Sequence, residues 1–251
     1  MIYFLLYTVQ ELCHHKLCSF VMAIYFIVFF LIYFFTQFAV SGHLKIAIDF
    51  GLFICFVTSI TFPILYTIPF IYRHQEQALW PFFLTKNISR TQLLIYTLLS
   101  FTIIFLTLCL LNYGIALCII KFFTSTWVLY IWPAYISIAM QGIFFISTAF
   151  FFSLITQPSI AQLALITIYF VCYTNHEWVH ILQQNEQPLT ACIATLLYYC
   201  LPDLSLLDMQ SEVIYQLPLS FCKITLSFIY ISLFCLFFIL SSLRVFNTKK
   251  L

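Results

Sequence analysis

Two histidines and a glutamate form the pattern in this sequence that most directly suggests chemistry. His176, Glu177 and His180 spell His-Glu-x-x-His. On a helix, histidines four residues apart lie on one face, as two zinc ligands must, and the glutamate between them can act as a general base. The pattern supports one hypothesis, a membrane zinc metalloprotease, although solvated side chains in an interfacial segment explain the same residues. Four acidic residues are candidates for the third zinc ligand: Glu186, Asp203, Asp208 and Glu212.

A second polar group lies between residues 73 and 92, in a short break between two hydrophobic stretches. Its charged residues are Arg73, Glu76, Lys86 and Arg90. Ser89 and Gln92 fit the capping box Ser-x-x-Gln, in which each side chain satisfies a free backbone N–H at the start of a helix. The pattern therefore predicts that a helix begins sharply after Ser89. A solvated loop between two membrane spans is the simplest explanation of the charges.

These polar residues are exceptions in a very apolar chain. Of its 251 residues, 64% are hydrophobic and 7% are charged, whereas soluble domains carry roughly 25% charged residues. We therefore expect an all-α, polytopic membrane protein, because a spanning helix satisfies every backbone polar group within its own segment. The aromatic share of 20% suits lipid-facing and interfacial positions. The formal net charge of +2 is too small to indicate a nucleic-acid partner.

Six stretches are predicted to be transmembrane helices. They cover residues 17–38, 46–72, 92–120, 127–155, 160–173 and 221–243. The fifth is the shortest, and if it does not cross, the two ends of the protein lie on opposite sides of the membrane.

The basic residues predict the orientation, because cytoplasmic loops carry an excess of Lys and Arg. With six spans and both termini in the cytoplasm, seven of the ten basic residues lie inside and three lie outside. The predicted inner residues are Lys16, Arg73, Lys86, Arg90, Arg244, Lys249 and Lys250. The predicted outer residues are Lys45, Lys121 and Lys223.

We treat residues 1–251 as a single domain with three segments outside the spans. A signal peptide would need a basic beginning, whereas the first charge here is Glu11. Because polar residues follow the apolar beginning directly, residues 1–16 are predicted to form a helix at the cytoplasmic interface. The alternative is one longer, tilted first helix. Residues 73–91 form a cytoplasmic segment, and residues 174–220 form an outer-side segment. Cys192 and Cys200 lie there and would be able to form a disulfide in an oxidising compartment.

Three polar positions fall within or near the predicted spans. Asn112 and Gln141 are amides at membrane depth, and such side chains usually bond across helices. Packing is the favoured explanation, and lining a translocation path is the alternative. Asp49 follows Lys45 by four residues, and an interfacial ion pair between them accounts for it.

Two short segments resemble the ABC-2 type transporter permeases. Arg73 through Glu76, followed by the run Leu-Thr-Lys-Asn-Ile-Ser-Arg-Thr-Gln at residues 84–92, resembles the family's Arg/Glu stretch, which leads to Lys-Pro-(Ile/Val)-Ser-Arg-x-Gln and the third helix. Residues 198–209, Tyr-Tyr-Cys-Leu-Pro-Asp-Leu-Ser-Leu-Leu-Asp-Met, resemble the Leu-Pro-Asn/Asp segment before the last helix, especially in the NosY-like branch. Asn87 stands where the family has proline, which predicts a looser turn before Ser89. Ile95 and Tyr96 replace a Gly-Lys pair.

The resemblance implies a non-catalytic permease subunit of an ATP-binding cassette exporter in the bacterial inner membrane. Its partners would be a separate ATPase subunit, a second permease subunit (an identical or a related chain) and membrane lipid. The permease would bind no cofactor, and ATP and Mg²⁺ would be held by the ATPase. The chain has no GxxxxGK[ST] phosphate-binding loop, which agrees with this division of labour. The resemblance assigns ATPase coupling to Arg73, Glu76, Lys86, Ser89 and Arg90. A third hypothesis is a membrane scaffold or assembly factor without transport.

Overall fold

The structure, a computed structural model, describes residues 43–76, 89–125, 127–184, 202–217 and 221–248, together with positions 10, 30 and 34. Every regular element in these ranges is a helix. Four helical stretches are long and apolar enough to cross a membrane, and they correspond to the second, third, fourth and sixth predicted spans. They are Leu44–Glu76, Arg90–Phe122, Leu129–Ile155 and Cys222–Thr248. By length and composition, the chain is an integral membrane protein with several spans.

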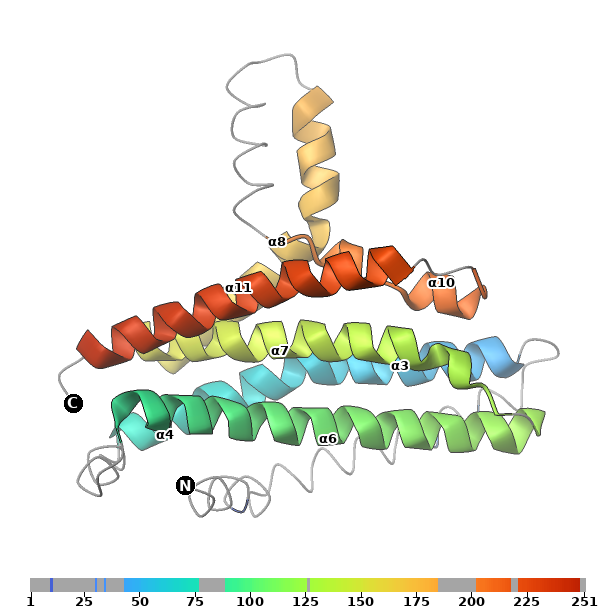
Figure 1. Cartoon of the computed structure of the whole chain (residues 1–251), viewed down its shortest axis with the longest axis horizontal. Coiled ribbons are helices and arrows are strands. Elements are labelled where there is room, and N and C mark those ends of the chain that lie inside the picture. Colours follow the sequence, from blue (N-terminus) through green and yellow to red (C-terminus); the bar gives the residue numbers. More distant parts are fainter. Residues whose placement is uncertain are drawn as a thin grey trace.

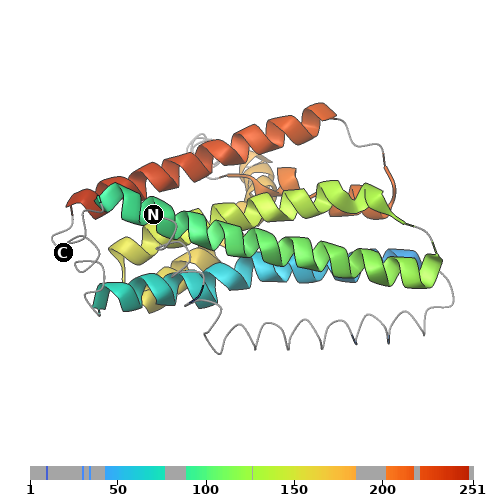
Figure 2. The same cartoon turned by 60° about the horizontal axis from the view of Figure 1, so that its bottom comes forward.

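Four long helices lie side by side along the length of the molecule, as Figures 1 and 2 show. They are α3 (His43–Phe62), α6 (Arg90–Thr124), α7 (Trp132–Ile155) and α11 (Phe221–Thr248). A short connection with the 3₁₀ turn η2 (Leu129–Ile131) joins α6 to α7, so these two helices run in opposite directions. Helix α7 is central, since it packs against α3, α6, α8 and α11. Its side chains are therefore mostly buried.

The second predicted span is one helical path with an irregular middle. Helix α3 leads into a π-helical turn, η1 (Pro63–Thr67), and then into α4 (Ile68–Glu76). Pro63 and Pro69 lack the N–H that would continue the α-helical ladder, so the backbone must adjust between them. The N–H of Ile68 bonds to the carbonyl of Pro63, five residues earlier. This is the pattern of a π-bulge.

Large side chains fill the interior. Phe101 and Phe105 of α6 are fully buried, and the ring of Phe105 lies 5.7 Å from the ring of Phe62, centroid to centroid. Gly142 of α7 faces Phe105 so closely that an added Cβ would lie 2.1 Å from the Phe105 Cζ atom. With only 4 glycines in the chain, such a close approach of helices is rare here, and aromatic packing replaces small-residue packing.

The fifth predicted span, residues 160–173, lies in helix α8 (Pro158–Gln184). Its beginning packs against α7 and α4, and its last turns rise away from the bundle (Figure 1). Helix α8 is not among the four helices long and apolar enough to span within the described residues. Four of the six predicted spans therefore correspond to described helices that are long and apolar enough to cross a membrane.

Several predictions concern residues outside the described part of the chain. These are the interfacial helix at residues 1–16, most of the first span at 17–38, Lys86, the Cys192–Cys200 pair, and Lys249 and Lys250.

Candidate functional site

One end of the bundle brings together the ends of three helices that are far apart in sequence. The end of α4, the start of α6 and the end of α11 meet there (Figure 1, left). Arg73, Glu76 and Arg244 are exposed at this end, and Arg90 is half-buried. We refer to this region, with Ser89, as the basic end. Four of the five predicted coupling residues belong to it, and the fifth, Lys86, lies outside the described residues.

The start of α6 has the predicted capping box. The Ser89 Oγ accepts a hydrogen bond from the Gln92 N–H at 3.3 Å, and the Gln92 Oε1 accepts one from the Ser89 N–H at 3.2 Å. Ser89 has an extended backbone, as an N-cap residue should. The reciprocal bonds fix the residue at which α6 begins, and they thereby fix the position of Arg90 immediately after it.

Arg90 connects the start of α6 to the end of α11. Its guanidinium Nη1 donates a hydrogen bond to the backbone carbonyl of Asn247 at 3.4 Å. The last carbonyls of a helix lack partners within the helix and carry partial negative charge, so a cation at this place is favourable. The sequence did not indicate this contact, because Asn247 is 157 residues away and carries no motif.

Buried apolar residues hold the three helix ends together beneath the charges. Ile71 of α4, Leu93 of α6 and Phe246 of α11 are each 0% exposed and belong to one cluster. Beside them, the buried His74 stacks on Phe70 with 4.0 Å between ring centroids, and its Nδ1 lies 3.0 Å from the Phe70 carbonyl. A displacement of α4 at this end must therefore disturb α6 and α11 as well.

The π-turn separates this end from the rest of the second span. Gln162 of α8 donates a hydrogen bond from its Nε2 to the Ile64 carbonyl at 3.2 Å. A carbonyl within an irregular turn needs such an outside donor when it is removed from water. Sequence reasoning missed this feature, although Pro63 and Pro69 inside one predicted span were a readable signal.

The two candidate path residues are buried at different levels of the bundle. Asn112 of α6 and Gln141 of α7 are 2% and 1% exposed. Gly142 faces Phe105, and Tyr113 contacts Tyr135 with 5.0 Å between ring centroids. In this antiparallel register, a rise of 1.5 Å per residue separates the two amides by about 8 Å along the bundle.

Among the residues that the structure describes, neither amide makes the full set of cross-helix hydrogen bonds that the sequence predicted. In the described part of the chain, the Nδ2 of Asn112 and the Oε1 of Gln141 are buried without a hydrogen-bond partner. Polar atoms left in this way cost free energy. Packing through hydrogen bonds therefore does not account for these two atoms.

The opposite end of the bundle carries the predicted outer basic residues. Lys45, Lys121 and Lys223 all lie there, away from the basic end. The predicted ion pair between Lys45 and Asp49 is wrong. The Lys45 ammonium instead lies over the ring of Tyr215, 5.3 Å from its centroid, because the chain folds α10 (Gln210–Ile214) back against α3.

The described part of the predicted outer-side segment packs deeply into the bundle. Leu204 and Leu207, in the 3₁₀ turn η3 (Leu204–Leu207), are 0% and 1% exposed. The Asp203 N–H donates to the Tyr230 hydroxyl at 3.2 Å. Tyr230 lies nine residues after Phe221, the first residue of α11, which is about 13 Å along that helix. This part of the predicted outer-side segment therefore packs against the bundle, with the two leucines of η3 buried in its core.

The alternative metal site lies on α8. Its backbone is helical through residues 176–180, so the spacing of His176 and His180 is that of one helical turn, but their side chains lie outside the described part of the chain. Among the side chains that are described, no group of three or more His, Cys, Asp or Glu residues is placed to hold a metal ion.

Comparison with known proteins adds no family to this description. No protein-family model matches the chain, and no curated protein is significantly similar to it. The features that point to a function are therefore the basic end and the sequence patterns that lie there.

Proposed function

We propose that this chain is the membrane-spanning subunit of an ATP-binding cassette exporter of the ABC-2 type. It would pair with a second permease subunit, identical or related, and with separate ATPase subunits that hold ATP and Mg²⁺. The observation that carries the proposal is the basic end. There the capped start of α6, which has the sequence pattern similar to ABC-2 permeases, bonds to the end of α11 through Arg90 and Asn247.

The geometry of the basic end suits a surface that receives motion from a soluble partner. Helix α4 carries Arg73 and Glu76 on its last turn, and the π-turn lies between α4 and α3. A push on α4 would bend the chain at the π-turn, because that segment has the least regular hydrogen bonding of the second span. The buried contacts among Ile71, Leu93 and Phe246 would pass the movement to α6 and α11.

The charge of the basic end indicates the chemistry of the partner. Arg73, Arg90 and Arg244 give it three positive charges, against the one negative charge of Glu76 among the described residues. An ATPase surface with acidic side chains would complement it. The same arginines would then be on the cytoplasmic side, in agreement with the excess of basic residues expected there.

Charge reversal at the basic end tests this proposal. The full-length chain is co-expressed with a cassette ATPase, which the proposal expects to be encoded beside its gene, and the ATPase that co-purifies is measured. We expect Arg90→Glu to lower the amount by about tenfold, because a like charge would face the acidic partner. Glu76→Lys replaces the one acid among the described residues of this surface with a positive charge and is expected to raise the amount.

Lys121→Glu is the matched control, since it reverses an exposed charge at the opposite end of α6. It should leave co-purification unchanged. If Arg90→Glu and Glu76→Lys also leave it unchanged in a chain that still extracts as a folded protein, the basic end is not the ATPase-binding surface.

A further inference from the structure

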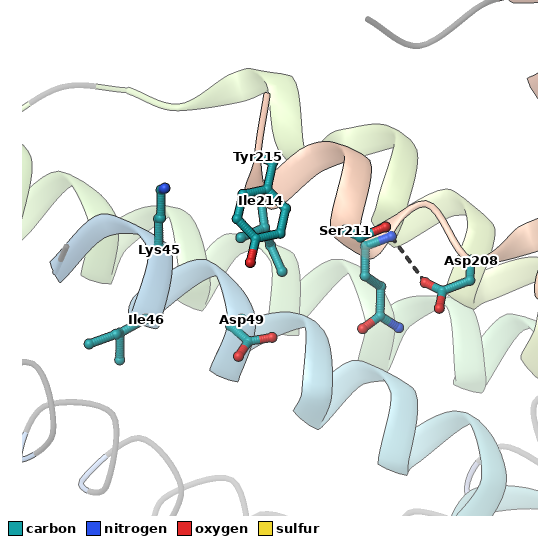
Figure 3. Close-up of a pocket in the computed structure, with 8 residues that line it drawn as sticks. Lys45, Ile46, Asp49, Asp208, Ser211, Ile214 and Tyr215 are labelled. Carbon is teal, nitrogen blue, oxygen red and sulfur yellow. Dashed lines mark hydrogen bonds between the residues drawn. The ribbon is translucent and has the colours of Figure 1, made fainter. Parts of the chain in front are cut away.

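A cavity of about 430 Å³ opens at the end of the bundle opposite the basic end. Helix α3 forms one side, and the turn before α10 together with α10 and Tyr215 forms the other (Figure 3). Its lining combines two carboxylates, one ammonium group, one aromatic ring and two aliphatic side chains. The lining residues are Lys45, Ile46, Asp49, Asp208, Gln210, Ser211, Ile214 and Tyr215.

The two carboxylates differ in how firmly they are held. Asp208 is fixed by two donors: the Tyr173 hydroxyl bonds to its Oδ2 at 2.9 Å and the Gln210 N–H bonds to its Oδ1 at 3.1 Å. Each oxygen keeps a lone pair for a further donor. Asp49 is exposed to the cavity, and within the described part of the chain its carboxylate has neither an ion-pair nor a hydrogen-bond partner. The cavity thus presents acceptors that remain available.

The ammonium group of Lys45 lies on the other side of the same space. It is positioned over the Tyr215 ring at 5.3 Å, and an ammonium group in such a contact keeps N–H donors that point away from the ring and can bind an anion. Lys45 does not neutralise Asp49, so charges of both signs remain along one wall of the cavity (Figure 3). A ligand with separated positive and negative groups matches this pattern better than a simple cation, which Lys45 would repel.

The cavity also lies beside the start of a candidate membrane span. Lys45 is the second residue of the candidate span Leu44–Glu76. Exposed aromatic residues occur at the same end of the bundle, as in the aromatic belts of membrane proteins. They are Trp127, Tyr130, Trp132 and Tyr215. Lipid headgroups surround the ends of membrane spans.

We propose that the cavity binds a zwitterionic aminoethyl phosphate group, with the ligand ammonium between Asp49 and Asp208 and the ligand phosphate at Lys45. The group can be the headgroup of an ethanolamine phospholipid or free phosphoethanolamine. This site lies at the opposite end from the basic end, and its occupancy does not depend on an ATPase partner.

Native mass spectrometry of the full-length chain in detergent tests the site. The probes are phosphatidylethanolamine and phosphatidylglycerol with the same acyl chains, which differ in the ammonium group. We expect the ethanolamine lipid to bind about tenfold more tightly, because it forms charge-assisted hydrogen bonds with two carboxylates. Asp49→Asn should remove this preference, and Lys45→Gln should weaken binding of both lipids. Lys121→Gln, at the same end but outside the cavity lining, should bind as the unchanged chain does.

Calorimetric titration with phosphoethanolamine distinguishes the two sources of the group. If phosphoethanolamine binds the unchanged chain and does not bind Asp49→Asn, the free headgroup is a sufficient ligand. If phosphoethanolamine does not bind but the ethanolamine lipid is still preferred over the glycerol lipid, the ligand is the lipid. Equal binding of both lipids by the unchanged chain, or an undiminished preference in Asp49→Asn, would overturn the proposal. Since Asp49 is exposed, the substitution is not expected to disturb folding, and an unchanged melting temperature confirms that.

Discussion

At the scale of single residues, the interior contains two buried amides, one on α6 and one on α7. Asn112 and Gln141 each keep a buried polar atom without a hydrogen-bond partner in the described part of the chain. A buried polar atom without a partner destabilises the fold. Such an atom suggests a function in which a ligand or water supplies the missing hydrogen bond. The two amides lie at different depths in the bundle, as polar groups along a translocation path would.

Gln141→Leu is predicted to stabilise the protein. The substitution removes the Gln141 Oε1 and replaces it with an apolar group of similar size, so the free energy of unfolding should rise by about 1 kcal/mol. In a chain of this length that is an increase of about 2–4 °C in the thermal midpoint, measured by thermal unfolding in detergent.

Thr148→Val provides the matched comparison for this prediction. Thr148 is buried on the same helix, but its hydroxyl already donates to the Phe144 carbonyl at 2.8 Å, so its loss should bring no gain. A lower midpoint for Gln141→Leu would contradict the account, because it would mean that the amide is well bonded.

At the scale of elements, the helices pack mainly through large side chains, and the tightest contact at a described glycine is that of Phe105 with Gly142. Phe105 of α6 lies over Gly142 of α7 and is held from the other side by Phe62. The ring is fully buried, so it has little room to yield. The packing of α6 on α7 therefore depends on the missing side chain at residue 142.

Gly142→Ala is predicted to destabilise the bundle by about 1–3 kcal/mol, because the added methyl group would overlap the Phe105 ring. Thermal unfolding in detergent measures the change. Gly114→Ala is the control on α6, where an added Cβ meets no atom within 4 Å; it should be neutral or stabilising by up to about 1 kcal/mol. Equal midpoints for the two variants would show that Gly142 is not a tight contact.

Local patterns predicted the elements better than their contacts. The capping box predicted the start of α6 correctly, because it depends on residues three positions apart. The Arg90–Asn247 bond and the Gln162–Ile64 bond join residues distant in sequence, and single side chains of these types carry no signal for a partner. The Lys45–Asp49 prediction failed for the same reason, since Tyr215 arrives from a distant segment.

At the scale of the whole molecule, the described arginines and lysines lie at opposite ends of the bundle. Arg73, Arg90 and Arg244 lie at one end, and the three described lysines lie at the other. Helix α6 has 35 residues, which at 1.5 Å per residue is about 52 Å. This length exceeds the roughly 40–45 Å of a bilayer with its headgroups, so both ends of α6 are able to reach water.

Labelling from one side of the membrane tests this orientation. Thr248→Cys places a thiol at the basic end, and Leu217→Cys places one at the opposite end, both in a chain whose exposed Cys118 and Cys222 are replaced by serine. In intact spheroplasts, a membrane-impermeant maleimide should label Leu217→Cys above the parent chain and leave Thr248→Cys at the parent level. In inside-out vesicles the order should reverse. Labelling of both thiols from one side would refute the orientation.

The most direct measurement is ATP turnover by the purified chain and its cassette ATPase together in lipid vesicles. The account predicts that the two proteins form a stable complex, that this chain alters the turnover of the ATPase, and that Arg90→Glu abolishes the change while Lys121→Glu preserves it. The central claim is contradicted if the ATPase hydrolyses ATP at one rate with and without this chain, or if both variants behave as the unchanged protein does.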